Sequence, residues 1–384
     1  MTTDPSNLVE GAPTEVNPEK DVQLWIGPQH PGITGNMSMQ IWVRGDEIRL
    51  GRTHIGYLHR GFEKLIERRK FIQAFPIVCR ICVPEPDTNE YLLAASIEEL
   101  AGLEVPEKGL WLRTLVMEMS RLAATIQALG GQAGSMGLGL VPNWTYTLRD
   151  YILDAFEELT GGRVYHMYTV FGGVRRDMPD GFKERLEETL KLIEKRLPAI
   201  DNVVFDNAVF QKRAVGIGVV KPEWVDEMGI SGPTARGCGL PRDIRRDFPY
   251  LKYGEIDFDV TTHEGGDIFA RSMVRRGDIV ESIKIIRQIL ARFPMQGRFC
   301  AKLPNMLHWE VPKGQTFVRA EASRGEMSYY AATDGSDKAR RVHVRGPSYV
   351  HAMSLLERML PGTIYSDMTP MMVSMQTCPP EIER

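Results

Sequence analysis

Two copies of one short motif stand near opposite ends of this 384-residue chain. The first is Cys82-Val-Pro-Glu85 and the second is Cys378-Pro-Pro-Glu381. Each copy offers a thiol and, three residues later, a carboxylate, and such groups bind metal ions or carry out redox chemistry. Because about 300 residues separate the two copies, only the tertiary fold can bring them together. We expect one pocket built from both.

Composition excludes several classes of protein. Hydrophobic residues make up 43% and charged residues 25% of the chain, as in ordinary folded proteins. The net charge of −3 gives no basis for binding nucleic acid. No apolar run reaches the roughly 18 residues of a transmembrane helix. Residues 1–21 are polar, resemble neither a signal nor a transit peptide, and are predicted to be a flexible lead-in to a single domain over residues 22–384.

Cysteine usage argues against a disulfide framework. The chain has five cysteines and no predicted signal peptide, which favours a reducing compartment. Cys79 and Cys82 form a CxxC pattern, which alone suggests half a zinc site or a redox pair. No second CxxC follows, so a four-cysteine zinc or iron–sulfur site within this chain is excluded. Cys238 and Cys300 lie in no motif and are interpreted as structural.

Hydrophobic periodicity predicts an α+β fold that is mainly α. A helical bundle core is expected, with small antiparallel β portions packed on it as one unit. Residues 230–253 are rich in Gly, Pro and Arg and are interpreted as a long ordered loop. Strands are expected at 24–26, in a hairpin over 37–50 and in a sheet over 321–346; helices are expected at 62–69, 89–103, 112–126, 143–159, 180–197 (ended by Pro198), 278–293 and, as the last one, 349–359.

Many short motifs, in order along residues 22–384, resemble one superfamily. They resemble the large subunit of membrane-bound [NiFe] hydrogenases and the homologous quinone-site subunit of respiratory complex I. The sequences around the two Cys-x-Pro-Glu copies look most like the large subunit of membrane-bound sulfane sulfur reductases. The motifs are Gly27-Pro-Gln-His-Pro31, His59-Arg-Gly-Phe-Glu-Lys64, Arg80-Ile-Cys82, Leu103-Glu-Val-Pro-Glu107, Leu159-Thr-Gly-Gly-Arg163, Phe171-Gly-Gly-Val-Arg175, Ser231-Gly-Pro233, Asp334-Gly-Ser336 and Val344-Arg-Gly-Pro-Ser348.

The resemblance fixes the register of the two motifs. Hydrogenase large subunits carry Arg-x-Cys-Gly-x-Cys early and Asp-Pro-Cys-x-x-Cys-x-x-Arg late. Setting Arg80 and Arg384 on the two arginines puts cysteine at the first position of each pair and glutamate at the second. In this register the CxxC formed by Cys79 and Cys82 is not a ligand pair, and Cys79 matches no ligand position. The four ligand positions become Cys82, Glu85, Cys378 and Glu381.

These ligand positions predict that no NiFe centre forms. Carboxylates are hard donors and poor substitutes for thiolates that bridge to a low-spin iron. We therefore expect no hydrogenase activity and no metal or other cofactor bound by this chain, although a lone divalent metal stays open. Without metal, Cys82 and Cys378 would take up sulfane sulfur by thiol exchange. Glu85 and Glu381 would donate protons if burial raises their pKa values.

Residues expected to contact a quinone in the complex I subunit are replaced here. Thr34 and Val83 stand where the family has a histidine and a tyrosine that hold the headgroup, which weakens a quinone site without excluding it.

The remaining candidates each have two interpretations. His30 lies near the pocket or fixes its own loop; His59 and Arg60 lie near a partner's iron–sulfur cluster or in a packed core; Arg80 holds a negative charge beside the pocket or pairs with a glutamate.

The resemblance implies a large subunit of a membrane-bound, complex I-like oxidoreductase. Electrons would come from a small iron–sulfur partner, supplied by ferredoxin or NAD(P)H, and reduce sulfane sulfur or polysulfide. Further peripheral-arm and membrane-embedded subunits would couple this to ion pumping, with the chain on the cytoplasmic face of the membrane. One alternative is a quinone or phenazine reductase subunit of an NADH-dehydrogenase type. Another is a coupling scaffold with a vestigial site.

Overall fold

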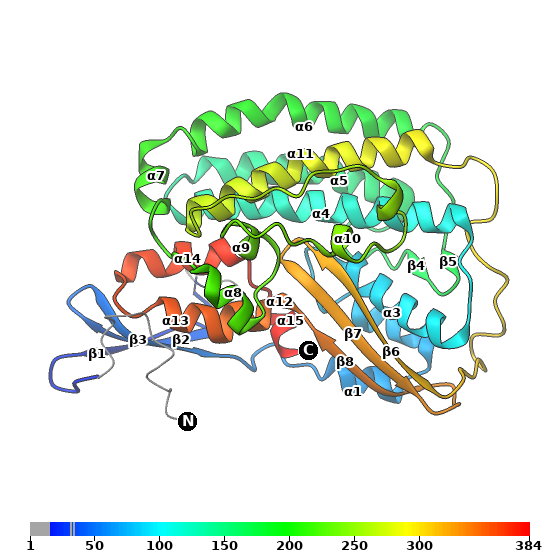
Figure 1. Cartoon of the computed structure of the whole chain (residues 1–384), viewed down its shortest axis with the longest axis horizontal. Helices are drawn as coiled ribbons and strands as arrows, with labels where there is room; N and C mark the ends of the chain where they lie inside the picture. Colours follow the sequence, from blue (N-terminus) through cyan, green and yellow to red (C-terminus); the bar gives the residue numbers. More distant parts are fainter. Residues whose placement is uncertain (1–15, 31–32, 34) are drawn as a thin grey trace.

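A layer of long helices lies on a layer of small sheets and short helices (Figure 1). The computed structural model describes residues 16–30, 33 and 35–384. Most of the expected N-terminal lead-in, and Thr34, lie outside the described residues. The mainly helical α+β class is confirmed. The long helices are α4 (Glu107–Ser135), α5 (Leu140–Thr160), α6 (Phe182–Val204) and α11 (Ile268–Arg292).

Helix α4 forms the centre of the helical layer because its sequence is apolar on more than one side. Leu112, Leu115 and Leu122 are fully buried, and the helix packs against both α5 and α11. Helix α6 lies on the outside of the layer (Figure 1). It buries a single stripe that includes Leu186 and Leu190 and exposes its charged face.

Three antiparallel sheets supply the β portions. The hairpin predicted over residues 37–50 is strands β2 and β3, and β1 pairs with β2. The predicted C-terminal sheet is strands β6 to β8, in sequence order. The strands are β1 (Val22–Ile26), β2 (Ser38–Arg44), β3 (Glu47–His54), β4 (Thr169–Val170), β5 (Gly173–Val174), β6 (Gly314–Ala322), β7 (Gly325–Thr333) and β8 (Ala339–Arg345).

Short helices connect the two layers. Several begin with proline in the first turn, where the missing N–H costs no hydrogen bond. The full set of shorter helices is α1 (Phe62–Arg68), α2 (Phe75–Val78), α3 (Pro86–Ala101), α7 (Ala208–Ala214), α8 (Pro222–Met228), α9 (Gly232–Arg236), α10 (Ile244–Asp247), α12 (Pro347–Val350), a π-helical turn (His351–Leu355), α13 (Leu356–Met359), α14 (Met368–Met375) and α15 (Pro379–Glu383).

Several predicted boundaries were wrong, for physical reasons. Helix α6 continues through Pro198 to Val204, because the exposed ring points to solvent. Helix α11 begins ten residues before the predicted start at 278, capped by Asp267, whose side chain accepts the Ala270 N–H. Its first turns carry arginines that are buried, so they gave no apolar pattern. The helix over 349–359 is not the last, because α14 and α15 follow it.

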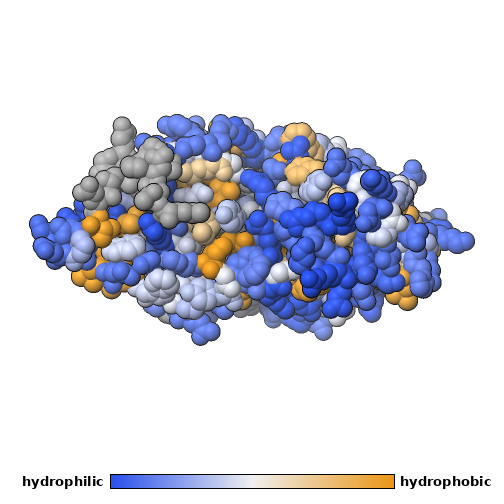
Figure 2. Space-filling view, turned by 90° about the horizontal axis from the view of Figure 1, so that it is seen from below, coloured by the Kyte–Doolittle hydropathy of each residue, from blue (hydrophilic) through white to orange (hydrophobic). Residues whose placement is uncertain are grey.

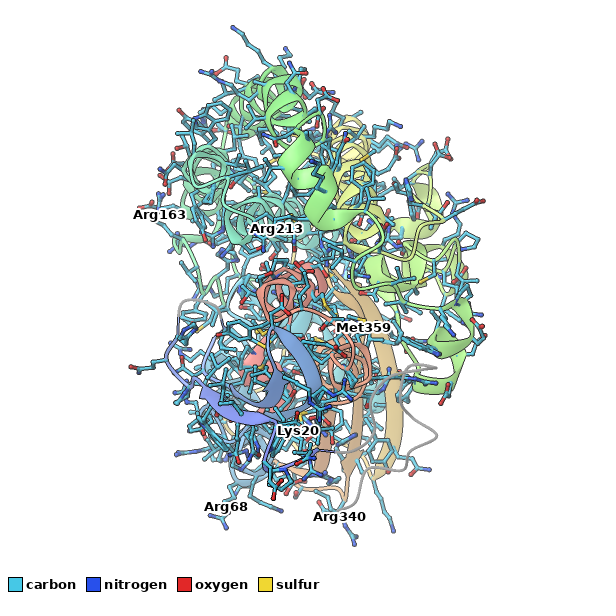
Figure 3. The ribbon with its side chains drawn as sticks, turned by 90° about the vertical axis from the view of Figure 1, so that its left-hand side faces the viewer. Lys20, Arg68, Arg163, Arg213, Arg340 and Met359 are labelled. Carbon is cyan, nitrogen blue, oxygen red and sulfur yellow. The ribbon has the colours of Figure 1, made fainter. Side chains whose placement is uncertain are left out.

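Two hydrophobic cores meet near the middle of the molecule. One joins the long helices with β1–β3 and the C-terminal helices. The other joins α1–α3 with β6–β8. Figure 2 shows that the underside is mostly hydrophilic, with its apolar residues gathered toward the end that carries β1–β3. Figure 3 looks along the molecule from that end, and Arg68 of α1 and Arg340 of β8 point outward at the bottom of the view. No helix within the described ranges combines the length and apolar character that crossing a bilayer requires.

Candidate functional site

Three chain segments that are distant in sequence meet where the two cores join. Cys82 lies in the loop between α2 and α3. Cys378 is the residue at which α15 begins. The third segment is the β6–β7 turn, which carries Ser323 and Arg324. All four residues are buried. The fold therefore brings the two distant motifs together, as the sequence indicated.

The two thiols form a pair that shares one positive charge. The ligand atoms of Cys82, Cys378 and Glu381 all lie within 4.8 Å of one another. Arg324 Nη1 donates to Cys82 Sγ at 3.0 Å. The pKa of Cys378 is lowered because the Cys82 thiol donates a hydrogen bond to it, and Arg324 adds to this effect. That same hydrogen bond, together with burial, raises the pKa of Cys82. This environment favours one thiolate beside one thiol.

The two glutamates have different surroundings, although their motifs match. Glu85 accepts three hydrogen bonds from the backbone N–H and hydroxyl of Ser323, at 2.7–3.1 Å, and its Oε2 lies 3.5 Å from Arg324. Glu381 accepts the Ser348 N–H at 2.9 Å, and its Oε2 has no partner among the described residues. Burial raises the pKa of Glu381. Glu381 therefore holds its proton to higher pH and is the carboxyl that faces the thiols.

A NiFe centre does not fit these residues. Only two cysteine sulfurs converge here among the described residues, and the oxygens of Glu85 are already used by Ser323 and Arg324. Cys82, Cys378 and Glu381 alone converge closely enough to share an ion, within the part of the chain that the structure describes. Two thiolates and one carboxylate match no NiFe ligand set, since bridging to iron requires further sulfur donors.

An open pocket of about 330 Å³ lies next to the thiol pair. Its lining includes Cys378, Arg324 and Thr377, together with Tyr146 of α5 and Gly131 of α4. A pocket of this size accommodates a small molecule. Cys378 is thus the thiol that a molecule in this pocket meets first, with Cys82 behind it.

The nearby Cys79 and Arg80 do not contribute to the thiol pair. Arg80 donates to the Pro76 carbonyl and to Cys79 Sγ at 3.2 Å, and its guanidinium lies over the ring of Tyr165. It holds neither the expected charge nor a glutamate among its described contacts, because its side chain runs back along α2. Burial raises the pKa of Cys79 to about 12, so this thiol stays protonated. Cys79 is also not among the residues that converge with Cys82 and Cys378 in the described part of the chain.

The other predicted residues that the structure describes are exposed and do not line the pocket. Val83 is 39% exposed, and His30 is exposed in its loop, where its carbonyl accepts the Ile33 N–H. His59 is exposed and its Nδ1 bonds to the Glu383 carbonyl at 2.6 Å. Arg60 is exposed, with its guanidinium 5.5 Å from the centre of the Phe62 ring. None of these four lines the pocket.

Sequence reasoning missed Arg324, Ser323 and Ser348. The Ser323-Arg324-Gly325 segment was interpreted as a turn signal, and it is indeed the β6–β7 turn. Its turn composition masked a buried arginine, 2% exposed. Ser348 receives the Cys378 N–H at 3.1 Å and fixes the start of α15. Ser348 ends the motif Val344-Arg-Gly-Pro-Ser348, which supported the family resemblance but predicted no role for this serine.

Comparisons with known proteins now identify the family. The sequence profile described as "Respiratory-chain NADH dehydrogenase, 49 Kd subunit" matches residues 136–384. A curated relative, a subunit of the NADH-quinone oxidoreductase of Thermosipho melanesiensis, is 42% identical over 95% of this chain and 100% of its own length. The chain belongs to the 49 kDa subunit family. It is therefore an oxidoreductase subunit of the kind found in complex I-like complexes.

Members of the 49 kDa subunit family with other names also match over almost their whole length. A subunit of the F(420)H(2) dehydrogenase of Methanosarcina mazei is 36% identical over 96% of this chain and 100% of that protein. A solved chain from the membrane-bound sulfane sulfur reductase, an archaeal respiratory membrane complex, is 37% identical with a TM-score of 0.93. It covers 96% of this chain and all of its own length. The relatives thus belong to multi-subunit respiratory complexes, and their names give different electron donors and acceptors.

Proposed function

We propose that this chain reduces sulfane sulfur or polysulfide at the Cys82–Cys378 pair, within a membrane-bound complex on its cytoplasmic face. The observation that carries the proposal is the buried pair itself, in which Arg324 binds Cys82 Sγ and Cys378 lines an open pocket. The likeness to a solved sulfane sulfur reductase chain supports it. The electrons come from an iron–sulfur cluster of a partner subunit, which ferredoxin or NAD(P)H reduces, and the reaction drives ion pumping.

The reaction proceeds by thiol–disulfide exchange. The Cys378 thiolate attacks a sulfane sulfur, one S–S bond of the polysulfide breaks, and the shortened polysulfide leaves with the electron pair. Cys82 then attacks Sγ of the Cys378 persulfide, which forms the Cys82–Cys378 disulfide and releases hydrosulfide. The proton of the hydrosulfide comes from the Cys82 thiol. Two electrons from the partner's cluster and one proton then restore the thiol and thiolate pair, and a second proton returns to Glu381.

Each neighbouring residue has a stated part in these steps. Arg324 stabilises the attacking thiolate, since a buried guanidinium favours an adjacent negative charge. Glu381 donates a proton to the leaving sulfur, because its raised pKa keeps it protonated when an exposed glutamate has ionised. Ser348 positions both Cys378 and Glu381 by bonding to each.

Substituting the thiols tests the proposal. Polysulfide reduction by the native complex should fall at least ~100-fold in Cys82→Ser and in Cys378→Ser, because each removes one partner of the exchange. Cys79→Ser is the matched control, and it should keep wild-type turnover. Unchanged polysulfide reduction in both site variants would overturn the proposal. A complex that instead reduces quinone, and loses that activity with a quinone-site inhibitor, would favour the alternative that the names of relatives suggest.

A further inference from the structure

Two arginines of helix α11 are buried without a carboxylate partner. Arg271 is 0% and Arg275 is 4% exposed, and neither has an ion pair within the described part of the chain. The carboxylate that acts most on Arg275 is Asp278, but both its oxygens bind Arg236, at 2.5 and 2.9 Å. Burying an uncompensated charge is strongly unfavourable, so a negative group is missing from this region.

The unsatisfied atoms of Arg275 form one edge of its guanidinium. Its Nε and Nη2 have no partner among the described residues, while Nη1 reaches the Arg271 carbonyl at 3.4 Å. Elsewhere in this chain the same edge holds an anion. The next residue, Arg276, uses Nε and Nη2 to bind both oxygens of Asp201, at 2.6 and 2.8 Å. The edge of Arg275 has the right geometry for an anion and lacks one.

A buried histidine belongs to the same region. His351, in the π-helical turn, is 0% exposed, and both its ring nitrogens are without a partner in the described structure. Burial lowers its pKa to about 3, with Arg275 as the charge that acts most on it and Arg271 next. The ring is therefore neutral and offers one N–H donor. A π-helical turn often marks a functional position.

The side-chain donors of Arg271, in contrast to those of Arg275, already have partners. Its Nη1 donates to the carbonyls of Gly218 and Gly266 at 2.9 and 2.8 Å, and its Nε and Nη2 donate to Ser374 Oγ at 3.0 and 2.8 Å. Arg271 thus contributes charge rather than a donor. Its own pKa is lowered to about 10 and that of Arg275 to about 9, mainly by burial, so both remain cationic at neutral pH.

We propose that a small monovalent anion, a halide or hydrosulfide, binds at the buried Nε–Nη2 edge of Arg275, in the region that also holds His351. The site is closed to solvent, which restricts it to a small ion. It is distinct from the thiol pair, and it holds whether or not the thiols reduce sulfur. The charge of Arg324 acts on His351 and on Arg275 as well as on the thiols.

Hydrogen exchange tests the site in the native complex. Replacing gluconate by bromide at constant ionic strength should slow amide exchange in the peptides of α11 and residues 347–355. The expected factor is about tenfold when bromide is ten times its Kd, since a ligand suppresses opening by 1 + [L]/Kd. Arg275→Met should abolish this slowing. Arg276→Met is the matched control, because Arg276 already binds Asp201, and it should keep the slowing.

Anomalous diffraction of the wild-type complex in bromide keeps the test decisive if Arg275→Met fails to fold. A bromide peak beside Arg275 Nε and Nη2 supports the site. Adding hydrosulfide at fixed bromide shows which of the two anions the site prefers. Loss of the bromide peak identifies hydrosulfide, and persistence of the peak identifies a halide. Water alone at this position, together with no effect of bromide on exchange, would overturn the proposal.

Discussion

At the scale of single residues, Arg324 controls the charge of the thiol pair. It donates to Cys82 Sγ and to the Gln376 carbonyl, and it lies 3.5 Å from Glu85. The resemblance placed the four positions Cys82, Glu85, Cys378 and Glu381 in one region from sequence alone. The resemblance did not predict that Arg324 belongs to the site, because the role of a residue in a turn depends on which distant loops the turn contacts.

Removing this arginine should change how the thiols ionise. Arg324→Met should raise the pKa of the first thiol to ionise by at least ~1 unit, because the adjacent cation is lost. The rate of alkylation by iodoacetamide, followed against pH by mass spectrometry of the Cys82 and Cys378 peptides, measures this shift. Arg324→Lys should fall between the two. An alkylation midpoint that is the same in all three proteins would show that Arg324 does not hold the thiolate.

At the scale of elements, the crossing of α4 and α5 is closest at Gly130. A Cβ on Gly130 would lie 1.8 Å from Thr145 Oγ1 and 2.9 Å from its Cβ, so the helices would have to move apart. The neighbouring Gly131 has open space, since its nearest contact would be Val373 Cγ1 at 4.0 Å. Position 131 of α4 therefore has room for a side chain, and position 130 does not.

Alanine substitutions should separate these two positions. Gly130→Ala should destabilise the chain by about 1–3 kcal/mol, the usual cost of overpacking. Gly131→Ala should be neutral or stabilise by up to about 1 kcal/mol, because alanine favours helix over glycine. Urea denaturation of the two variants beside wild type measures both values. Equal losses of stability would contradict the close crossing.

Periodicity predicted the existence of most elements but not all their ends. Strands β2 and β3, the sheet β6–β8 and helix α4 followed from local patterns of apolar residues. The start of α11 did not, because Arg271 and Arg275 are charged residues in a buried turn, and burial is set by tertiary packing. Pro198 was interpreted as a helix end, although α6 continues through it. The hydrogen bond that the proline removes does not end a helix whose apolar stripe stays buried on both sides of it.

At the scale of the whole molecule, buried charges link the layers and make stability depend on pH. Glu321 of β6 accepts the Ile244 N–H at 3.2 Å, and Arg121 of α4 donates to the backbone carbonyl of Glu321. Burial, and then Asp243, raise the pKa of Glu321 from 4.5 to about 8. Between these two pH values the folded chain holds a proton that the unfolded chain has released.

Unfolding therefore releases this proton, and raising the pH from 4.5 to about 8 should lower the contribution of Glu321 to stability. Glu321→Gln removes the titration, so the free energy of unfolding should fall less steeply with pH across this window in the variant than in wild type. Urea denaturation at a series of pH values measures the two slopes. Parallel slopes would show that Glu321 is already ionised in the folded chain.

The central claim is that Cys82 and Cys378 act as one redox pair, and trapping their disulfide tests it most directly. The native complex, treated with tetrasulfide in the absence of an electron donor, is quenched with an alkylating agent and digested without reductant. We predict a cross-linked peptide joining Cys82 to Cys378, which disappears once the electron donor is added, while Cys79 stays a free thiol. Full alkylation of both Cys82 and Cys378 after tetrasulfide treatment would contradict the account.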